Sequence, residues 1–204
     1  MPNLMEIGLI VVVLLFSIII HEVAHGYAAL MNGDPTARLA GRITLNPLPH
    51  IDLVGTIILP LLLLATKTGM IFGWAKPVPV NPYNFRNLRW GEITVSLAGP
   101  LSNLLLAAVF AFLYHLDLGG PGLKKLAYAG VVVNIFLALF NLIPIPPLDG
   151  SHIVAALLPY NLARLYQYLE PFGFILLIAL FYTGVVGFFL FPIYLWLRTL
   201  LLGF

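Results

Sequence analysis

The chain has 204 residues, of which 61% are hydrophobic and only 9% charged, and its formal net charge at pH 7 is +2. Soluble domains are about half apolar and about a quarter charged, so this composition excludes an ordinary soluble enzyme and gives no electrostatic attraction to nucleic acid. The remaining class is an all-α polytopic membrane protein surrounded by the lipid bilayer. The sequence has no cysteine, which excludes disulfides, thiolate metal ligands and a cysteine nucleophile.

Four segments are long and apolar enough to cross a bilayer. In chain order they are about Leu4–Met31, Ile93–Leu116, Leu126–Ile143 and Phe172–Leu197. The last contains Gly184 and Pro192, which favour a kink, but splitting it at Gly184 would leave two halves too short to span alone. We therefore expect about four transmembrane helices, the last of them long and either tilted or broken.

The apolar stretch 53–65 could either cross the membrane or re-enter it. As a span it would divide six basic residues between two sides, whereas a re-entrant segment leaves all six, between Met31 and Gly91, on one face. The re-entrant arrangement places seven basic residues inside and three outside, which the positive-inside rule favours. It predicts that both termini are external and that the first and third spans run from outside to inside.

The polar region between the first two spans is predicted to contain a small membrane-associated β hairpin and an extended segment. Residues 36–45 alternate loosely between apolar and polar side chains and end at Asn46-Pro47, which is typical of a short hairpin. Residues 73–82 contain three prolines within six positions and must be extended. Such backbone is tolerated beside a membrane where protein or water satisfies it, so these segments are expected to roof a wet cavity. An ordinary loop is the alternative.

The sequence His21-Glu22-Val23-Ala24-His25 near the end of the first span is an HExxH motif. Residues four apart share one face of a helix, so His21 and His25 can bind one zinc ion while Glu22 lies beside the open coordination position. There Glu22 can accept a proton from a water, which is the general-base role of this motif in metalloproteases. Ionisable groups in a bilayer are costly, and a metal would compensate them. A helix end among lipid headgroups is the alternative.

Two histidines leave a zinc site one protein ligand short. Asp149 is the main acidic candidate, because it follows the proline-rich break Pro144-Ile-Pro-Pro147 at the end of the third span. Because the first and third spans both run from outside to inside, His25 and Asp149 lie near the inner ends of their helices, at similar depth. This common depth favours Asp149 as a metal ligand over a simple Asp-Gly turn. The predicted site is His21, His25, Asp149 and water.

Three motifs resemble those of the site-2 protease family of intramembrane zinc metalloproteases. HEVAHG lies in the first span, AGPLSN (98–103) in the second and NLIPIPPLDG (141–150) in the third. The resemblance implies that Glu22 is the catalytic base. It also implies that His21, His25 and Asp149 hold one zinc ion per chain.

The resemblance further suggests which residues contact substrate. It assigns this role to Asn141 and Pro144, with Asn103 as a further candidate that could instead only lock helices together. Residues 38–46 resemble the membrane-associated β region against which a substrate strand is thought to pair. No insertion is long enough for a PDZ domain and there is no CBS tail. Residues 1–204 are therefore expected to form one membrane-embedded domain, with a catalytic core at about 4–153 and a C-terminal helix at about 171–200.

The expected function is a zinc-dependent endopeptidase that cleaves a single-pass transmembrane protein or peptide within the membrane. The expected location is a prokaryotic cell membrane, with the active site nearer the cytoplasmic side. A membrane zinc carrier or sensor and an inactive scaffold that binds transmembrane segments are the alternatives. The sequence predicts neither the natural substrate nor the oligomeric state. His50 and Asp52 could form a weak metal site, although structural hydrogen bonds are favoured, and His152 could orient a ligand.

Overall fold

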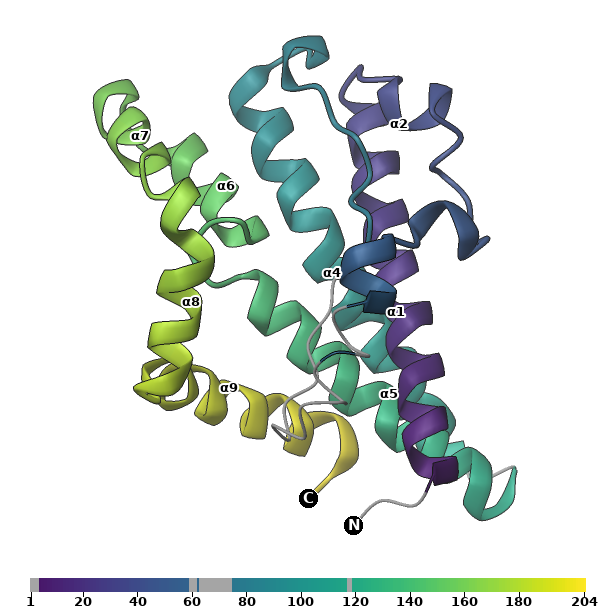
Figure 1. The fold of residues 1–204 in the computed structure, drawn as a ribbon. Coiled ribbons are helices and arrows are strands. Elements are labelled where there is room, and N and C mark those ends of the chain that lie inside the picture. Colours follow the sequence, from purple (N-terminus) through teal and green to yellow (C-terminus); the bar gives the residue numbers. More distant parts are fainter. Residues whose placement is uncertain (1–3, 59–61, 63–74, 117–118) are drawn as a thin grey trace.

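The structure of the protein is a computed structural model that describes residues 4–58, 62, 75–116 and 119–204. Within these ranges every regular element is helical (Figure 1). The longer helices are α1 (Leu4–Met31), α4 (Leu88–Leu116), α5 (Gly120–Asn141), α6 (Asp149–Leu157), α7 (Tyr160–Gln167), α8 (Gly173–Tyr182) and α9 (Val185–Leu202). The short helical elements are α2 (Thr36–Leu39), η1 (Leu48–His50), η2 (Leu53–Ile58), η3 (Pro82–Asn84) and η4 (Glu170–Phe172).

Five helical segments of the described chain are long and apolar enough to cross a membrane. They are Ile7–Met31, Leu88–Leu116, Gly120–Asn141, Tyr160–Tyr182 and Val185–Leu202. The first three match predicted spans, and the expected total of about four is corrected to five candidates. With 61% hydrophobic residues, the chain is an integral membrane protein.

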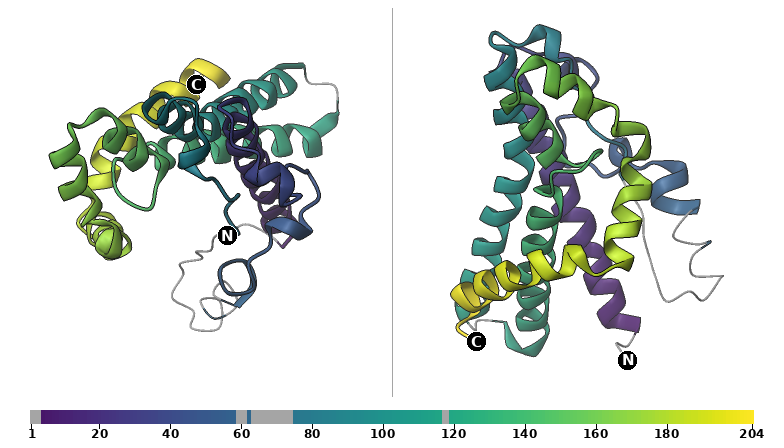
Figure 2. Two further views of the ribbon diagram at one scale, coloured as in Figure 1. Left: turned by 90° about the horizontal axis from the view of Figure 1, so that it is seen from above. Right: turned by 90° about the vertical axis from the view of Figure 1, so that its left-hand side faces the viewer.

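Helices α1, α4 and α5 form the centre of the molecule (Figures 1 and 2). Between α4 and α5 the packing is close, because a Cβ atom at Gly130 would overlap the ring of Phe110. Val131 and Ile135 on α5 are fully buried in the hydrophobic cluster that also contains Phe110. These three helices therefore provide a rigid frame for the polar side chains that they carry inward.

The predicted β hairpin is wrong: the part of the chain that the structure describes contains no strand, and residues 36–39 form helix α2. The cause is the preceding turn. α1 ends at Met31 and the chain turns at Gly33, whose φ of +107° is left-handed. The next residue, Asp34, accepts hydrogen bonds from the backbone N–H and the hydroxyl of Thr36, the first residue of α2, and a second left-handed glycine, Gly41, follows the helix. These local hydrogen bonds outweigh the weak alternation of 36–45.

The proline-rich segment is extended, as predicted, over its described part. We call residues 75–81 the strap, and it runs alongside α1 (Figure 1). Arg42 Nη2 donates to the carbonyl oxygens of Lys76 and Pro77 at 2.7 and 3.1 Å, and the Lys76 N–H donates to His50 O at 2.9 Å. At the other end of the strap, the Asn81 N–H donates to Asp34 Oδ2 at 2.7 Å. The strap is thus held by α1 and its following turns rather than by a sheet.

Asp34 is a fully buried carboxylate at the end of the strap. Burial raises its pKa, but hydrogen bonds from the Asn81 N–H, the Thr36 hydroxyl and N–H, and the Asn84 amide outweigh burial and lower the pKa below its usual value. The ionised form of Asp34 therefore joins the end of α1 to the segment that precedes α4.

The prediction that the C-terminal segment forms a single span is wrong, whereas a break in it was one of its two expected forms. The chain breaks at Gly184, whose φ of +75° is left-handed, and α9 turns away from α8 there (Figure 1). The two halves on either side of Gly184 are longer than the sequence suggested. α9 continues to Leu202, and α7 and η4 extend α8 into the longer candidate span 160–182. The N-terminal end of α1 and the C-terminal end of α9 lie at the same end of the molecule (Figure 2).

The apolar stretch 53–65 is only partly described. Residues Leu53–Ile58 form the π-helical element η2. Residues 59–61 and 63–65 lie outside the described residues, so whether this stretch spans or re-enters stays a prediction.

Candidate metal centre

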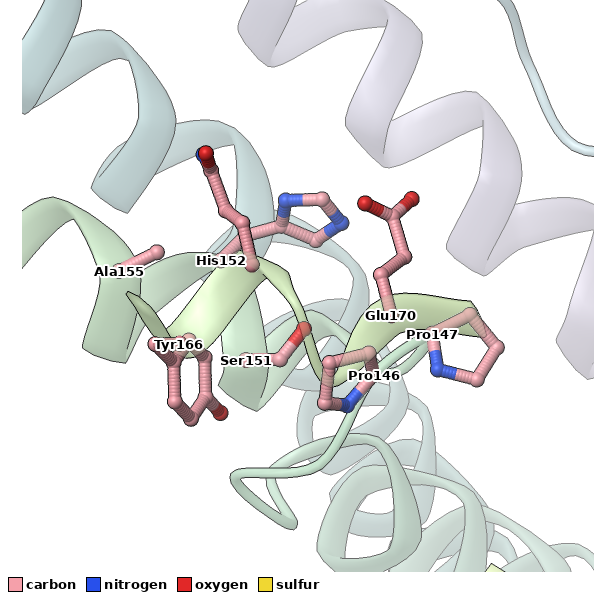
Figure 3. A pocket seen from close by; sticks show the side chains of 8 residues that line it. Pro146, Pro147, Ser151, His152, Ala155, Tyr166 and Glu170 are labelled. Carbon is pink, nitrogen blue, oxygen red and sulfur yellow. The ribbon is translucent and has the colours of Figure 1, made fainter. Parts of the chain in front are cut away.

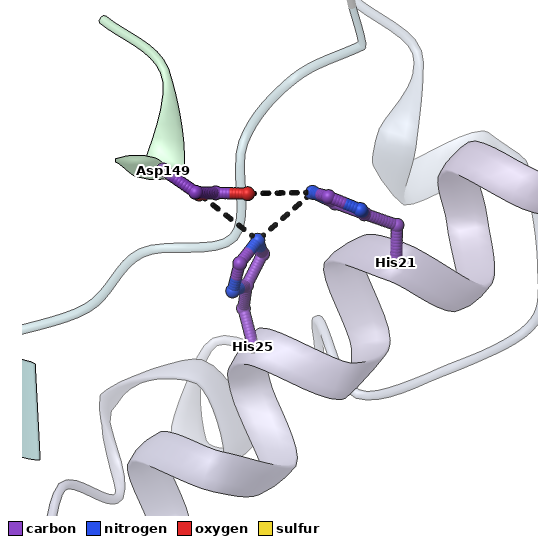
Figure 4. Close-up of side chains that lie close together, drawn as sticks. All are labelled: His21, His25 and Asp149. Carbon is purple, nitrogen blue, oxygen red and sulfur yellow. Dashed lines mark hydrogen bonds and ion pairs between the residues drawn. The ribbon is translucent and has the colours of Figure 1, made fainter. Parts of the chain in front are cut away.

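The structure brings His21, His25 and Asp149 together (Figure 4). The two histidines lie one turn apart on α1, and Asp149 begins α6. Asp149 Oδ2 is 3.2 Å from His21 Nε2, and Asp149 Oδ1 is 3.3 Å from His25 Nε2. The two Nε2 atoms are 3.0 Å apart. Both histidines are buried and Asp149 is partly buried, so the predicted ligands share one site.

The outer nitrogen of each histidine faces an oxygen that can only accept a hydrogen bond. His21 Nδ1 is 2.6 Å from Asn103 Oδ1, and His25 Nδ1 is 2.7 Å from the carbonyl oxygen of Val95. Each Nδ1 must therefore carry the proton, which leaves a lone pair on each Nε2 of the neutral rings. Two lone pairs 3.0 Å apart do not form a hydrogen bond. A cation between them removes this conflict.

The donor set fits zinc. Ligand bonds of about 2.0–2.1 Å in a tetrahedral site place donor atoms about 3.3 Å apart. The observed separations of 3.0, 3.2 and 3.3 Å agree with that value. Asp149 Oδ2 is buried without a hydrogen-bond partner. Two imidazoles and one carboxylate are a ligand set of catalytic zinc sites, which keep a fourth position open.

Gly99 on α4 makes room for this cluster. A Cβ atom at this position would lie 2.5 Å from His21 Cε1 and from His25 Nε2. Any side chain here would therefore push the imidazoles apart. Gly99 lies within the AGPLSN motif, but the sequence does not show that a hydrogen atom at this position faces the two predicted ligand histidines.

Glu22 is held by the strap. The Val78 N–H donates to Glu22 Oε2 at 2.7 Å, and Val78 itself is buried. The neighbouring residues Pro77 and Pro79 have no N–H, so Val78 supplies the donor in this part of the strap. Sequence analysis missed Val78. The alternation of proline and valine was the available signal, because proline has no backbone N–H and only the valines can donate a hydrogen bond.

Asn103 lies behind His21 rather than in an open position. It is fully buried, its Oδ1 faces His21, and its Nδ2 donates to Asn134 Oδ1 and to the carbonyl oxygen of Ser17. Its amide is therefore fully used within the protein. The observed contact makes Asn103 a partner of a ligand histidine, and Asn134 is a residue that sequence analysis missed.

The other two predicted substrate-contact residues lie where α5 ends and the turn toward Asp149 begins. Asn141 Nδ2 donates to the carbonyl oxygen of Leu137 at 3.0 Å, one turn back on its own helix. The Pro144 side chain is exposed, and its carbonyl oxygen accepts a hydrogen bond of 2.7 Å from the Tyr166 hydroxyl. The structure places both residues in the segment that leads to the ligand, and their contact with substrate stays a prediction.

A small pocket adjoins the turn before Asp149 (Figure 3). It is lined by Pro146, Pro147, Ser151, His152, Ala155, Tyr166, Gln167 and Glu170. His152 is half exposed and its Nδ1 is 4.0 Å from Glu92 Oε2, so its nearest charged partner is Glu92 and not a metal ligand. His50 and Asp52 hold local structure, through contacts with the Thr44 carbonyl oxygen and the Gly55 N–H. Within the described ranges, only His21, His25 and Asp149 form a metal-ligating group of three.

Comparison with known proteins places this chain among metalloproteases. Residues 117–180 match the family described as Peptidase family M50. Over 192 residues the chain is 40% identical to "Putative zinc metalloprotease YwhC" of Bacillus subtilis, covering 90% of this chain and 84% of that protein. Over 190 residues it is 32% identical to "Putative zinc metalloprotease Rip2" of Mycobacterium tuberculosis, covering 90% of this chain and 70% of that protein. No solved structure gives a significant match.

The family match covers the turn that carries Asp149, and the relatives align with nine-tenths of the chain. These matches confirm the resemblance deduced from the three motifs. They also support zinc as the metal, in agreement with the two imidazoles and one carboxylate of the site. The chain belongs to peptidase family M50, the site-2 protease family, and is a membrane zinc metalloendopeptidase.

Proposed function

We propose that this protein hydrolyses a peptide bond in or near a transmembrane helix of a single-pass membrane protein, with one zinc ion per chain held by His21, His25 and Asp149. The observation that carries the proposal is the convergence of two Nε2 lone pairs and a carboxylate inside a bundle of apolar helices. A soluble peptide substrate would not require a site between membrane helices. A transmembrane substrate would reach it by moving laterally in the bilayer.

Glu22 is the proposed general base. It follows His21 directly on α1, and one of its carboxylate oxygens accepts the Val78 N–H, while the other is proposed to face the attacking water. Zinc, when bound, polarises the scissile carbonyl and increases the acidity of the attacking water. Glu22 accepts a proton as the water oxygen bonds to the carbonyl carbon. It then donates this proton to the leaving nitrogen as the C–N bond breaks.

The chain's own hydrogen bonds orient the groups that act. The Val78 N–H fixes the Glu22 carboxylate, while Asn103 and the Val95 carbonyl fix the two imidazoles. Such outer contacts set the tautomer and the direction of a ligand histidine. Because these groups are already oriented, the reaction does not have to order them.

The substrate must be locally unwound, since a helical peptide bond is shielded by its own helix. Asn141 and Pro144 are proposed to contact this unwound segment, because Asn141 ends α5 and Pro144 lies in the turn that leads from it to Asp149. The surplus of basic residues between the first two spans supports an active site nearer the cytoplasmic side of a prokaryotic cell membrane. Water is proposed to reach the site from that side.

A zinc carrier would need ionisable residues along a path through the membrane. In the described part of the chain, the three metal-ligating residues instead form a single cluster. An inactive binding scaffold would have no need for an oriented Glu22. These observations favour hydrolysis over both alternatives.

Purified protein in vesicles with a panel of single-span peptides tests the proposal. We expect the wild type to contain about one zinc ion per chain and to cleave a membrane-embedded peptide. Glu22→Gln should keep zinc and lose cleavage, whereas Asp149→Ala should lose both. Glu170→Gln, which changes a carboxylate that is not at the metal centre, is the matched control and should behave as wild type. Cleavage by Glu22→Gln at the wild-type rate would refute the mechanism.

A further inference from the structure

A buried polar cluster between the three central helices reaches the candidate metal centre through Asn103. It consists of Ser17 on α1, Asn103 on α4 and Asn134 on α5, and all three are fully buried. Asn134 Nδ2 donates to Ser17 Oγ at 2.8 Å and to the carbonyl oxygen of Gly130 at 2.9 Å. Asn134 Oδ1 accepts a hydrogen bond of 2.9 Å from Asn103 Nδ2.

The direction of every hydrogen bond in this cluster is determined. The Gly130 carbonyl can only accept, so the group of Asn134 beside it must be the NH₂ group. Asn134 Oδ1 therefore faces Asn103, which must present its own NH₂ group in return. Asn103 Oδ1 is then left facing His21 Nδ1 at 2.6 Å. The orientation of Asn134, together with the Ser17 carbonyl oxygen that accepts from the same Nδ2 at 3.3 Å, thus determines which atom of Asn103 meets the histidine.

We propose that Asn134 is a positioning residue of the metal centre: it holds the Asn103 amide in one orientation and thereby keeps the His21 proton on Nδ1 and the lone pair on Nε2. The inference rests on the proposed zinc site. If the Asn103 amide turned over, its NH₂ group would face His21 Nδ1. The imidazole would then have to place its proton on Nε2, the atom that faces Asp149 and His25. That tautomer cannot bind a metal through Nε2.

The competing explanation is that the cluster only joins helices, as buried amides do in membrane proteins. Under that explanation, the loss of Asn134 lowers the stability of the bundle and leaves the His21 tautomer unchanged. Under our proposal, the tautomer and the zinc affinity change. Ser17→Ala separates the two, because it removes one partner of Asn134 but leaves the Gly130, Asn103 and His21 contacts in place.

The experiment uses the full chain in detergent and measures the zinc Kd by competition with a chelator. Asn134→Leu should weaken zinc binding about 10- to 100-fold, the usual effect of losing an outer partner of a ligand histidine. Asn134→Asp, protonated in this fully buried position, keeps a donor toward the Gly130 carbonyl and an acceptor toward Asn103. It should stay close to wild type, which also covers the case in which Asn134→Leu does not fold. Ser17→Ala should lower the melting temperature and leave the zinc Kd nearly unchanged.

Nitrogen NMR of ¹⁵N-histidine protein without metal gives the second readout. His21, assigned by its loss in His21→Gln, should be protonated at Nδ1 in the wild type and in Asn134→Asp. In Asn134→Leu it should populate both tautomers. Wild-type zinc affinity and tautomer in a folded Asn134→Leu protein would overturn the inference, as would weak binding by Asn134→Asp. A wild-type protein that binds no zinc would instead overturn the proposed function.

Discussion

Gly99→Ala is expected to increase the helix propensity of α4 and to weaken zinc binding at the candidate metal centre. Alanine is a better helix former than glycine by about 1 kcal/mol in a helix interior, so α4 itself should not suffer. The new methyl group would nevertheless lie 2.5 Å from both His21 Cε1 and His25 Nε2. An ordinary contact of this kind is about 3.4–4 Å, so the imidazoles must retreat by roughly 1 Å.

A displacement of this size far exceeds what a metal site tolerates, since ligand distances hold within about 0.2 Å. We expect the zinc Kd to rise at least about 100-fold, equivalent to about 2.7 kcal/mol. Cleavage should fall at limiting zinc, while the melting temperature of the metal-free protein stays equal or increases. The assay is chelator competition, combined with thermal unfolding of protein prepared without metal.

Gly187→Ala is the matched control, because this glycine lies inside α9 and a Cβ atom there has no neighbour within 4 Å. It should give the same gain in helix propensity without any change in zinc affinity. Wild-type zinc affinity in a folded Gly99→Ala protein would refute the geometry of the centre. Equal weakening by both glycine substitutions would also refute it.

Three further predictions concern the strap and the turn before the acidic ligand. Val78→Pro removes the N–H that binds the carboxylate of Glu22, the proposed general base, and should lower kcat about tenfold or more with zinc retained. Val80→Pro, which breaks no hydrogen bond seen in the described chain, should not lower it. Because the pKa of Asp34 is lowered in the folded state, its stabilisation is complete above the unfolded pKa of about 3.9 and is lost as pH falls through the folded value. Melting temperatures measured between pH 7 and pH 2 should show this loss in the wild type and not in Asp34→Asn. Tyr166→Phe removes the hydrogen bond to Pro144 and should cost about 1 kcal/mol of stability in denaturant titrations, and an unchanged midpoint would contradict that contact.

That His21, His25 and Asp149 lie together could be predicted from the sequence, because their pattern is either local or fixed by topology. His21 and His25 are four residues apart on a helix, which places them on one face without knowledge of the rest of the fold. Asp149 is distant in the sequence, but the parity of the spans brought it to the same depth as His25. Both arguments require only helix geometry and the direction of each span.

The supporting contacts could not be predicted in the same way. The roles of Gly99, Val78 and Asn134 depend on side-chain rotamers and on distances of a few tenths of an ångström between different helices. Hydrophobicity patterns do not contain this information. The sequence offered Asn134 only as one polar residue in an apolar span, where it needs a partner of unknown identity.

The two errors in the fold have local causes. Residues 36–39 form a helix because the Asp34 carboxylate binds the N–H and hydroxyl of Thr36, and this local contact outweighs a few alternating residues. The C-terminal span divided because Gly184 adopts a left-handed conformation that a continuous helix cannot contain. In both cases one residue at the boundary decided the structure of the segment that follows.

The most direct test of intramembrane hydrolysis compares protein termini in membranes that contain either the wild type or Glu22→Gln. Cells producing each form at equal levels are fractionated, and new termini are mapped by mass spectrometry. We expect new termini that arise only with the wild type and that lie inside or beside transmembrane segments of single-pass proteins. The same termini with Glu22→Gln, or wild-type-dependent termini confined to regions far from the membrane, would contradict intramembrane hydrolysis by this centre.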